Sequence, residues 1–159
     1  MNLAMQFRPA LETEAALLSA IAIDSNAHWP YPAAQLAAWR DELLITPQMV
    51  SSLPTFVAEI DCDLAGFFLL RPTAPHWPLE HLWVSRNYMG RGIGGGLLSH
   101  ALKVARASGA TAIAIDADPH AEQFYLKCGA VRTGSIPAPI EGAPARERPQ
   151  LLLLLDGRS

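Results

Sequence analysis

The sequence contains few of the residues that mark disulfide scaffolds and metal sites. It has two cysteines in 159 residues, Cys62 and Cys128, and their spacing is not that of a metal site. We interpret Cys62 as a turn residue and Cys128 as a core residue, with no partner suggesting nucleophilic chemistry. A reducing, cytoplasmic location is therefore the default expectation.

Runs of positive charge and long apolar runs are also missing. The net charge is −3 and no cluster of Lys and Arg stands out, so we expect no nucleic-acid partner. The run LLLLL at 151–155 is far shorter than the roughly 20 residues that cross a bilayer, and it is typical of a buried strand. The N-terminus lacks the pattern of a signal peptide. We expect no membrane association.

The composition is that of a globular protein. Half of the residues are hydrophobic and 17% are charged, and the length suits one domain over residues 1–159. The pattern predicts a mixed α/β fold rather than a regular βαβ winding. We expect strands at 3–8, 56–61, 64–71, 79–84, 111–116, 130–136 and 150–155, and helices at 11–23, 32–44, 97–108 and 119–128. Only Cys62 and Asp63 separate the second and third strands, which predicts a hairpin.

The stretch MGRGIGGG at 89–96 precedes a predicted helix, although glycine costs about 1 kcal/mol relative to alanine inside a helix. Glycine allows sharp turns and close approach of a ligand to the backbone. A helix N-terminus adds unpaired N–H groups and a partial positive charge, and the two together favour a phosphate site. The absence of GK[ST] excludes a P-loop, and GxGxxG fits only if its spacing is broken. A tightly packed glycine turn without a ligand is the alternative.

The segment LEHLWVSRNYMGRGIGGGLLSHAL resembles the acyl-CoA-binding motif of the GCN5-related N-acetyltransferase superfamily, Arg/Gln-x-x-Gly-x-Gly/Ala after the fourth strand. Met89 stands where that motif has Arg or Gln. The resemblance implies that backbone N–H groups bind the coenzyme pyrophosphate, and that a strand pairs with the pantetheine arm. The implied pyrophosphate loop is Gly90, Arg91, Gly92, Ile93, Gly94 and Gly95, and the implied strand residues are Leu82, Trp83 and Val84.

A second segment, DPHAEQFYLKCGA at 118–130, resembles the family's Asn-x-x-Ala-x-x-Phe-Tyr-x-x-x-Gly-Phe pattern. Asp118 replaces the Asn and Ala130 the final Phe. Asp118 is also expected to cap a helix that opens on Pro119. The family resemblance implies a mixed, mostly antiparallel sheet of about six or seven strands flanked by about four helices. It also implies acetyl-CoA as cosubstrate, without a metal, and places Asp118 and Tyr125 at the coenzyme.

The implied reaction is direct attack of a primary amine on acetyl-CoA in a ternary complex. Tyr125 matches the family's thiolate partner, and a hydrogen bond to the thiolate is easier than full proton transfer; a core role is the alternative. Glu80 is the candidate base, with a surface carboxylate as the alternative. Strand alternation puts Glu80, Leu82 and Val84 on one face and His81 on the other. His81 or water is the other possible proton acceptor.

The acceptor is open between a small-molecule amine and a protein amine. Asp116 either faces that amine or ends a strand in solvent. The aromatic and basic residues of the N-terminal third either line an acceptor groove or pack the helices on the sheet: Trp29, Tyr31, Trp39 and Arg40. Members of the family often dimerise, so a homodimer is possible. The alternative function is a non-catalytic acyl-CoA-binding sensor or regulatory module.

Overall fold

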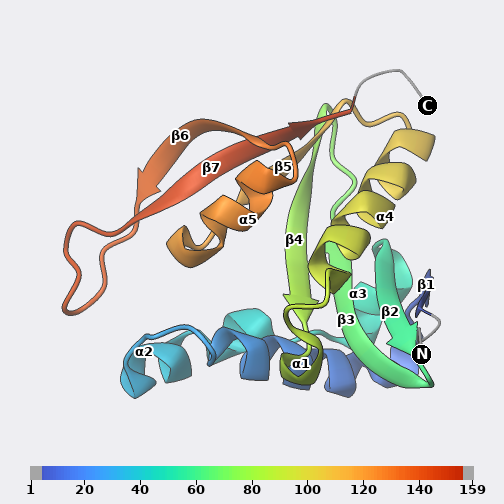
Figure 1. Ribbon diagram of the computed structural model, residues 1–159, viewed down its shortest axis with the longest axis horizontal. Helices are drawn as coiled ribbons and strands as arrows, with labels where there is room; N and C mark the ends of the chain where they lie inside the picture. The colour runs from blue at the N-terminus through green and yellow to red at the C-terminus, as the bar shows by residue number, and fades with distance from the viewer. Residues whose placement is uncertain (1–4, 156–159) are drawn as a thin grey trace. The chain divides into compact units, whose positions relative to one another are not determined.

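The computed structural model describes residues 5–155, which form seven β-strands and five α-helices (Figure 1). The strands form one mixed sheet in the order β1-β2-β3-β4-β5-β7-β6. The β4–β5 pair is parallel, and the β1–β2, β2–β3, β5–β7 and β6–β7 pairs are antiparallel. The expected mixed, mostly antiparallel sheet is confirmed. The described chain divides into two compact units. Unit 1 holds the residues up to Leu70 and Glu80–Ala101, and unit 2 holds Arg71–Leu79 and the residues from Leu102 onward.

The sheet of unit 1 begins with β1 (Met5–Pro9), β2 (Thr55–Ile60) and β3 (Asp63–Leu70). The first two residues of the strand predicted at 3–8 lie outside the described residues. The β2–β3 hairpin is confirmed, but its turn is Asp61 and Cys62, one residue earlier than predicted. Both have left-handed backbones, with φ of +48° and +69°. Two left-handed residues suit the right-handed twist of the flanking strands.

The helices of unit 1 differ most from prediction. Helix α1 spans Ala15–Asn26 after a short turn, Glu12–Glu14. The helix predicted at 32–44 breaks into α2 (Ala33–Ala38) and a 3₁₀ turn, Arg40–Leu43. Leu43 and Ile45 are both buried. Residues two positions apart lie on different faces of a helix, so the chain becomes extended after Leu43 to bury both.

Helix α3 (Pro47–Ser52) was not predicted, which makes five helices where about four were expected. Its start carries the usual local signals. Thr46 caps it by accepting from the Met49 backbone N–H at 3.1 Å, and Pro47 takes the first helical position. Six residues are too few to show a helical period in the sequence.

The core of unit 1 lies between α1 and the sheet. Ala15, Leu18 and Ala22, at helical spacing on α1, pack with Val57, Phe67 and Leu69 of β2 and β3. Ser19, on the same side of α1, accepts the Ile45 backbone N–H at 2.7 Å. The core therefore also holds the chain that leads into α3.

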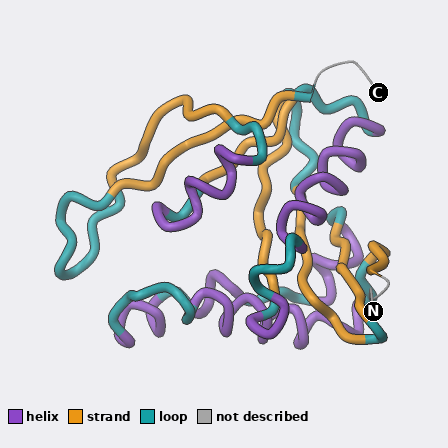
Figure 2. The backbone as a smooth tube through the Cα atoms, viewed as in Figure 1, coloured by secondary structure: helices purple, strands orange, loops and turns teal. Residues whose placement is uncertain are grey.

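Unit 2 is built around β5 (Ala112–Asp116), β6 (Val131–Pro137) and β7 (Glu147–Leu154), with α5 (Glu122–Lys127) after a 3₁₀ turn, Pro119–Ala121. The leucine run at 151–155 lies largely in β7, where Leu151 and Leu153 are buried, as expected of a strand. Figure 2 shows β6 and β7 as two strands joined by the 138–146 loop.

Two elements contribute residues to both units, β4 (His76–Val84) and α4 (Ile93–Ala107). Strand β4 begins three residues before the predicted 79–84, because Pro78 obscures its start. Pro78 lacks an N–H, yet its carbonyl still accepts the Arg71 N–H at 3.0 Å. Helix α4 is followed by Gly109 with φ of +87°, a left-handed glycine of the kind that commonly ends a helix. No helix within residues 5–155 is long and apolar enough to cross a membrane.

Candidate active site

The loop between β4 and α4 takes its shape from two glycines. Gly90 and Gly92 have φ of +79° and +78°, in the left-handed region that other residues adopt with strain. A Cβ atom built on either glycine would meet no atom within 4 Å, so the requirement is conformational rather than steric. A 3₁₀ turn, Arg86–Tyr88, follows β4, and the two left-handed residues then lead the chain into the first turn of α4.

The glycines inside α4 serve different purposes. At Gly96 a Cβ atom would lie 3.1 Å from Cζ of Phe7 and 3.3 Å from Cε of Met5, so this glycine makes room for β1. At Gly95 the same atom would lie in open space. The packing of unit 1 accounts for Gly96 but gives no reason for the glycine at 95.

Strand β4 presents backbone groups on the side away from β3. Ser85 donates its N–H to the carbonyl of Ala65 at 2.8 Å, so the backbone of Ser85 faces β3. Since backbone groups alternate along a strand, those of Leu82 and Val84 face the opposite side. The ladder with β5 covers His76–Pro78, the first three residues of β4. Leu82 and Val84 lie beyond it.

Two residues of the α1 C-terminus hold the end of β4 and the loop that follows. Ser25, buried with 3% of its surface exposed, donates its hydroxyl to the Val84 carbonyl at 2.6 Å. Arg86 donates to the Asp24 carbonyl at 2.9 Å and lies 3.5 Å from the Asp24 carboxylate. The sequence analysis missed Ser25 and Arg86, since no local motif links residues 59 or 62 positions apart.

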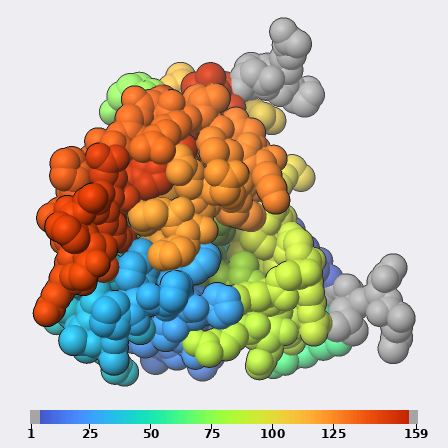
Figure 3. Space-filling view, turned by 60° about the vertical axis from the view of Figure 1, so that its left-hand side comes forward, coloured from blue at the N-terminus to red at the C-terminus, as the bar shows by residue number. Residues whose placement is uncertain are grey.

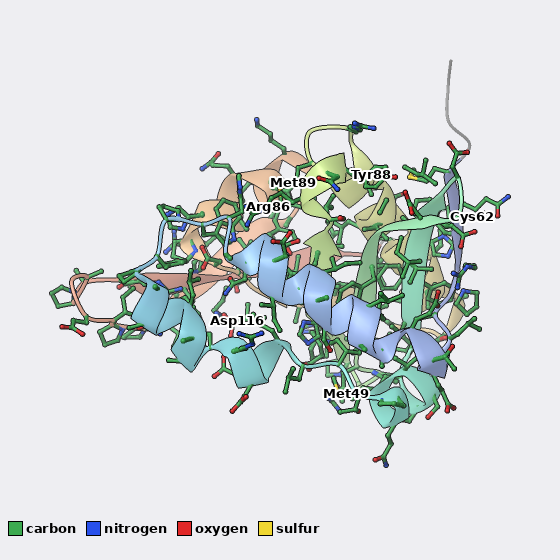
Figure 4. All side chains as sticks on the ribbon, turned by 90° about the horizontal axis from the view of Figure 1, so that it is seen from below. Met49, Cys62, Arg86, Tyr88, Met89 and Asp116 are labelled. Carbon is green, nitrogen blue, oxygen red and sulfur yellow. The ribbon has the colours of Figure 1, made fainter. Side chains whose placement is uncertain are left out.

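The loop also carries the half-buried Tyr88 and Met89, which Figure 4 labels beside Arg86, and the exposed Arg91. The guanidinium carbon of Arg91 lies 5.3 Å from the centre of the Tyr88 ring. Tyr88 donates its hydroxyl to Asp63 at 3.1 Å, and this bond raises the pKa of Tyr88. The loop therefore has a cationic side chain at Arg91, although Met89 stands where the family motif has Arg or Gln.

The two candidate bases, Glu80 and His81, have different environments on β4. Glu80 is exposed, whereas His81 is half-buried and lies near Phe67, with ring centres 6.1 Å apart. His81 Nδ1 accepts the indole N–H of Trp83 at 3.1 Å. Burial lowers the pKa of His81, and the nearby charge of Glu80 offsets part of this effect. His81 is thus kept neutral, with one ring nitrogen already engaged.

In unit 2, Tyr125 is the most buried residue of α5, with 8% of its surface exposed. Burial raises its pKa, and neighbouring Cys128 adds to the shift. Its neighbour Phe124 is only half-buried. The two rings meet edge to face, with centres 5.1 Å apart. The phenol therefore holds its proton at neutral pH.

The two aspartates near the end of β5 are engaged in ion pairs. Asp118 accepts the His120 backbone N–H at 2.8 Å, the expected cap, and pairs with Arg146 at 3.3 Å. Asp116 accepts from Arg148 at 2.8 and 3.0 Å and from Gln150 at 2.9 Å. Asp116 is therefore held by β7, which favours a structural role over contact with an acceptor.

The residues suggested for an acceptor groove lie at the end of α1 and around α2. Tyr31 and Trp39 pack edge to face, with ring centres 4.9 Å apart and planes at 89°. Both rings and Trp29 are half-buried, while Arg40 is exposed. The Tyr31–Trp39 pair supports the packing alternative for those two residues.

The predicted site residues fall into two groups. Unit 1 brings together the implied strand and loop, Glu80, Leu82, Trp83, Val84, Gly90, Arg91, Gly92, Ile93, Gly94 and Gly95, and unit 2 holds Asp118 and Tyr125. Figure 3 shows the yellow-green atoms around 85–95 on the surface of unit 1. Within residues 5–155, no group of His, Cys, Asp and Glu is arranged to hold a metal ion.

Several solved structures are similar to this chain. The chain is similar to a GCN5-related N-acetyltransferase from Rhodopseudomonas palustris, with 26% identity, a TM-score of 0.80, and 98% of this chain and 99% of that chain covered. It shares its fold with the PaiA N-acetyltransferase of Thermoplasma acidophilum in complex with coenzyme A (18% identity, TM-score 0.73, coverage 95% and 99%). It also shares its fold with YncA, a putative acetyltransferase of Salmonella typhimurium with acetyl-CoA (17%, 0.70, coverage 100% and 97%).

No match was found among curated proteins. The sequence pattern of the acetyltransferase (GNAT) family matches residues 17–130, more than half of the chain. This region contains β4, the glycine loop and α5. The chain belongs to the GNAT family of acetyltransferases.

Proposed function

We propose that this chain transfers an acetyl group from acetyl-CoA to a primary amine, by direct attack of the amine in a ternary complex. The observation that carries the proposal is the pair of left-handed glycines, Gly90 and Gly92, between the backbone edge of β4 and the start of α4. The relatives in complex with coenzyme A and acetyl-CoA support the same cosubstrate. We take residues 1–159 as one domain, because β4 and α4 both run through the two units.

The coenzyme pyrophosphate binds the loop from Gly90 to Gly95 in this proposal. The first N–H groups of α4 have no carbonyl one turn earlier in the helix, and the helix dipole favours an anion there. Leu82, Trp83 and Val84 form the strand beside the pantetheine arm. The backbone of Leu82, beyond the ladder with β5, is the group we assign to that pairing.

Glu80 is the proposed proton acceptor, directly or through water. An amine with a pKa near 10.4 arrives protonated and must lose a proton before attack. Glu80 is exposed on β4, whereas His81 is neutral but already accepts the Trp83 indole N–H. A Glu80→Gln variant with the pH–rate profile of the unaltered enzyme would transfer this role to water.

Tyr125 is the proposed hydrogen-bond donor to the departing thiolate. Its raised pKa makes proton release to a thiolate more uphill, and keeps the phenol O–H available as a donor. The acceptor is a small-molecule or protein amine.

The test of the coenzyme site uses position 95, where a new side chain fits without strain. Gly95→Asp places a carboxylate in the first turn of α4, where it favours the helix but repels a phosphate. At a few ångströms from the pyrophosphate this costs roughly 1–2 kcal/mol, or about tenfold in Kd. We expect calorimetric titration to show weaker binding of acetyl-CoA and of CoA, with thermal stability retained.

Gly95→Asn is the matched control, because it has the same size without the charge. We expect its Kd to stay within about threefold of the unaltered protein. Equal affinities for the Asp and Asn variants would remove the pyrophosphate from this helix end. No saturable binding of acetyl-CoA to the unaltered chain would overturn the proposed function itself.

A further inference from the structure

The loop between β6 and β7, residues 138–146, has little apolar packing of its own. Its residues are exposed or half-buried, and its outer part is closed by a bridge between Ile140 and Ala143. Gly142 turns the tip with φ of +84°. Figures 1 and 2 show this loop as the end of a long hairpin. Polar contacts at its base must therefore hold it.

Arg146 supplies these contacts. Only 10% of its side chain is exposed, and it donates to the Ala138 carbonyl at 3.1 Å, across the base of the loop. The backbone of the same two residues pairs as well, with the Ala138 N–H donating to the Arg146 carbonyl at 2.9 Å. The second arm of the guanidinium donates to Asp118 at 3.3 Å. One side chain thus joins both ends of the loop to the segment that leads into α5.

Asp118 occupies a position where a negative charge is unexpected. The related family pattern has Asn here, which has the same shape without the charge. One oxygen of Asp118 caps the turn by accepting the His120 N–H at 2.8 Å and lies 3.0 Å from the His120 ring. The other oxygen is the one that meets Arg146. An unpaired carboxylate at this position would repel an anionic coenzyme.

We propose that Arg146 is a positioning residue, which fixes the 138–146 loop and neutralises Asp118 so that a carboxylate can cap the coenzyme-binding segment. The part concerning the coenzyme rests on the proposed function. A buried guanidinium suits both tasks, because its planar fork serves two acceptors in a fixed geometry. Removal of the guanidinium takes the Arg146 ion pair away from the carboxylate.

The chain contains a matched control two residues away. Arg148 also pairs with an aspartate, Asp116, through two hydrogen bonds. Its side chain is 40% exposed and that of Asp116 is 48% exposed. The Arg148–Asp116 pair therefore has the chemistry of the Arg146–Asp118 pair without its burial.

The experiment is a double-mutant cycle of Arg146→Ala and Asp118→Asn, read as the Kd of acetyl-CoA. We expect Arg146→Ala to raise Kd at least tenfold in the unaltered background and less than threefold in the Asp118→Asn background. Arg146→Lys, which keeps the charge, should recover most of the affinity, and Arg148→Ala should change Kd less than threefold. The neutralising role would be overturned if Arg146→Ala raised Kd by the same factor in both backgrounds. It would also be overturned if Arg148→Ala raised Kd as much as Arg146→Ala does.

Amide hydrogen exchange without coenzyme tests the loop separately. We expect faster exchange over residues 138–146 in Arg146→Ala than in Arg148→Ala, and unchanged exchange in both would overturn the loop role. If Arg146→Ala does not fold, Arg146→Lys and Arg146→Gln supply the same comparison. If the unaltered chain does not bind acetyl-CoA, the proposed function and the neutralising role both fall, and exchange alone decides what Arg146 does for the loop.

Discussion

At the scale of single residues, Tyr125 shows how burial selects one role for a side chain. A phenol at the protein surface has a pKa near 10, already above that of a thiol near 8.5. Burial raises the pKa of Tyr125 further, so complete transfer of its proton to the thiolate becomes less favourable. A hydrogen bond to the thiolate asks for no such transfer. Burial therefore disfavours Tyr125 as a general acid but leaves its hydroxyl able to donate a hydrogen bond.

Tyr125→Phe tests this role, since it removes the hydroxyl and keeps the ring that packs on Phe124. A hydrogen bond to a charged group contributes about 1.5–3 kcal/mol, so we expect kcat to fall roughly 10- to 100-fold. The Kd of acetyl-CoA should stay nearly constant, because the thiolate forms only during the reaction. Steady-state kinetics with an accepted amine and calorimetry measure the two quantities. Unchanged turnover would take Tyr125 out of the chemistry.

At the scale of elements, the approach of β3 to β4 depends on one glycine. A Cβ atom on Gly66 would lie 2.6 Å from the Trp83 carbonyl oxygen and 3.2 Å from Cα of Val84. It would also lie 2.9 Å from the Leu97 side chain of α4. Two of these three atoms belong to backbone and cannot turn away. Gly66 therefore sets how closely the proposed pantetheine strand lies to β3.

We expect Gly66→Ala to lower the free energy of unfolding by about 1–3 kcal/mol, the usual cost of an overpacked core. Denaturant unfolding at neutral pH measures this change. Gly134→Ala is the control, because the added Cβ would meet no atom within 4 Å there. Similar stabilities for the two variants would mean that β4 shifts freely, contrary to the packing of unit 1.

At the scale of the whole molecule, titrating groups in both units limit the pH range of stability. In unit 1, the hydrogen bond from Arg8 lowers the pKa of Glu14, and burial lowers that of His81. Each favours its deprotonated form in the folded state, so each contribution is present at higher pH and lost as pH falls. Tyr125 in unit 2 has a raised pKa, so its contribution is present below about pH 10 and lost as pH rises.

We therefore expect the free energy of unfolding to be highest between about pH 6.5 and pH 10, and to fall on either side. Urea unfolding across this range measures it. His81→Gln isolates one group, because a glutamine oxygen can still accept the Trp83 indole N–H but does not titrate. Its stability should fall less than that of the unaltered protein as the pH drops below 6.5. Identical acid limbs would show that His81 does not contribute.

The sequence alone was enough for the features that depend on neighbouring residues. The glycines at 90 and 92 predict a special backbone because few other residues adopt a left-handed φ without strain. The Asp118-Pro119 cap and the buried leucines of β7 follow from equally local rules. These local features supported the predicted fold class and the two motifs of the proposed coenzyme site. The break in the helix predicted at 32–44 did not follow, because the burial of both Leu43 and Ile45 overrides helical periodicity, and α3 is too short to show a helical period.

Only the tertiary structure decided what each site residue is free to do. Ser25 donates a hydrogen bond to Val84, 59 residues away in the chain, and Arg146 donates one to Asp118, 28 residues away. No pattern in the sequence connects such pairs. The same is true of His81, whose ring nitrogen is occupied by Trp83, and of Gly96, whose place in α4 is explained by β1. Backbone conformation is set by local sterics and can be predicted from neighbours. Burial and pairing depend on which distant segments meet, and this is decided only when the chain has folded.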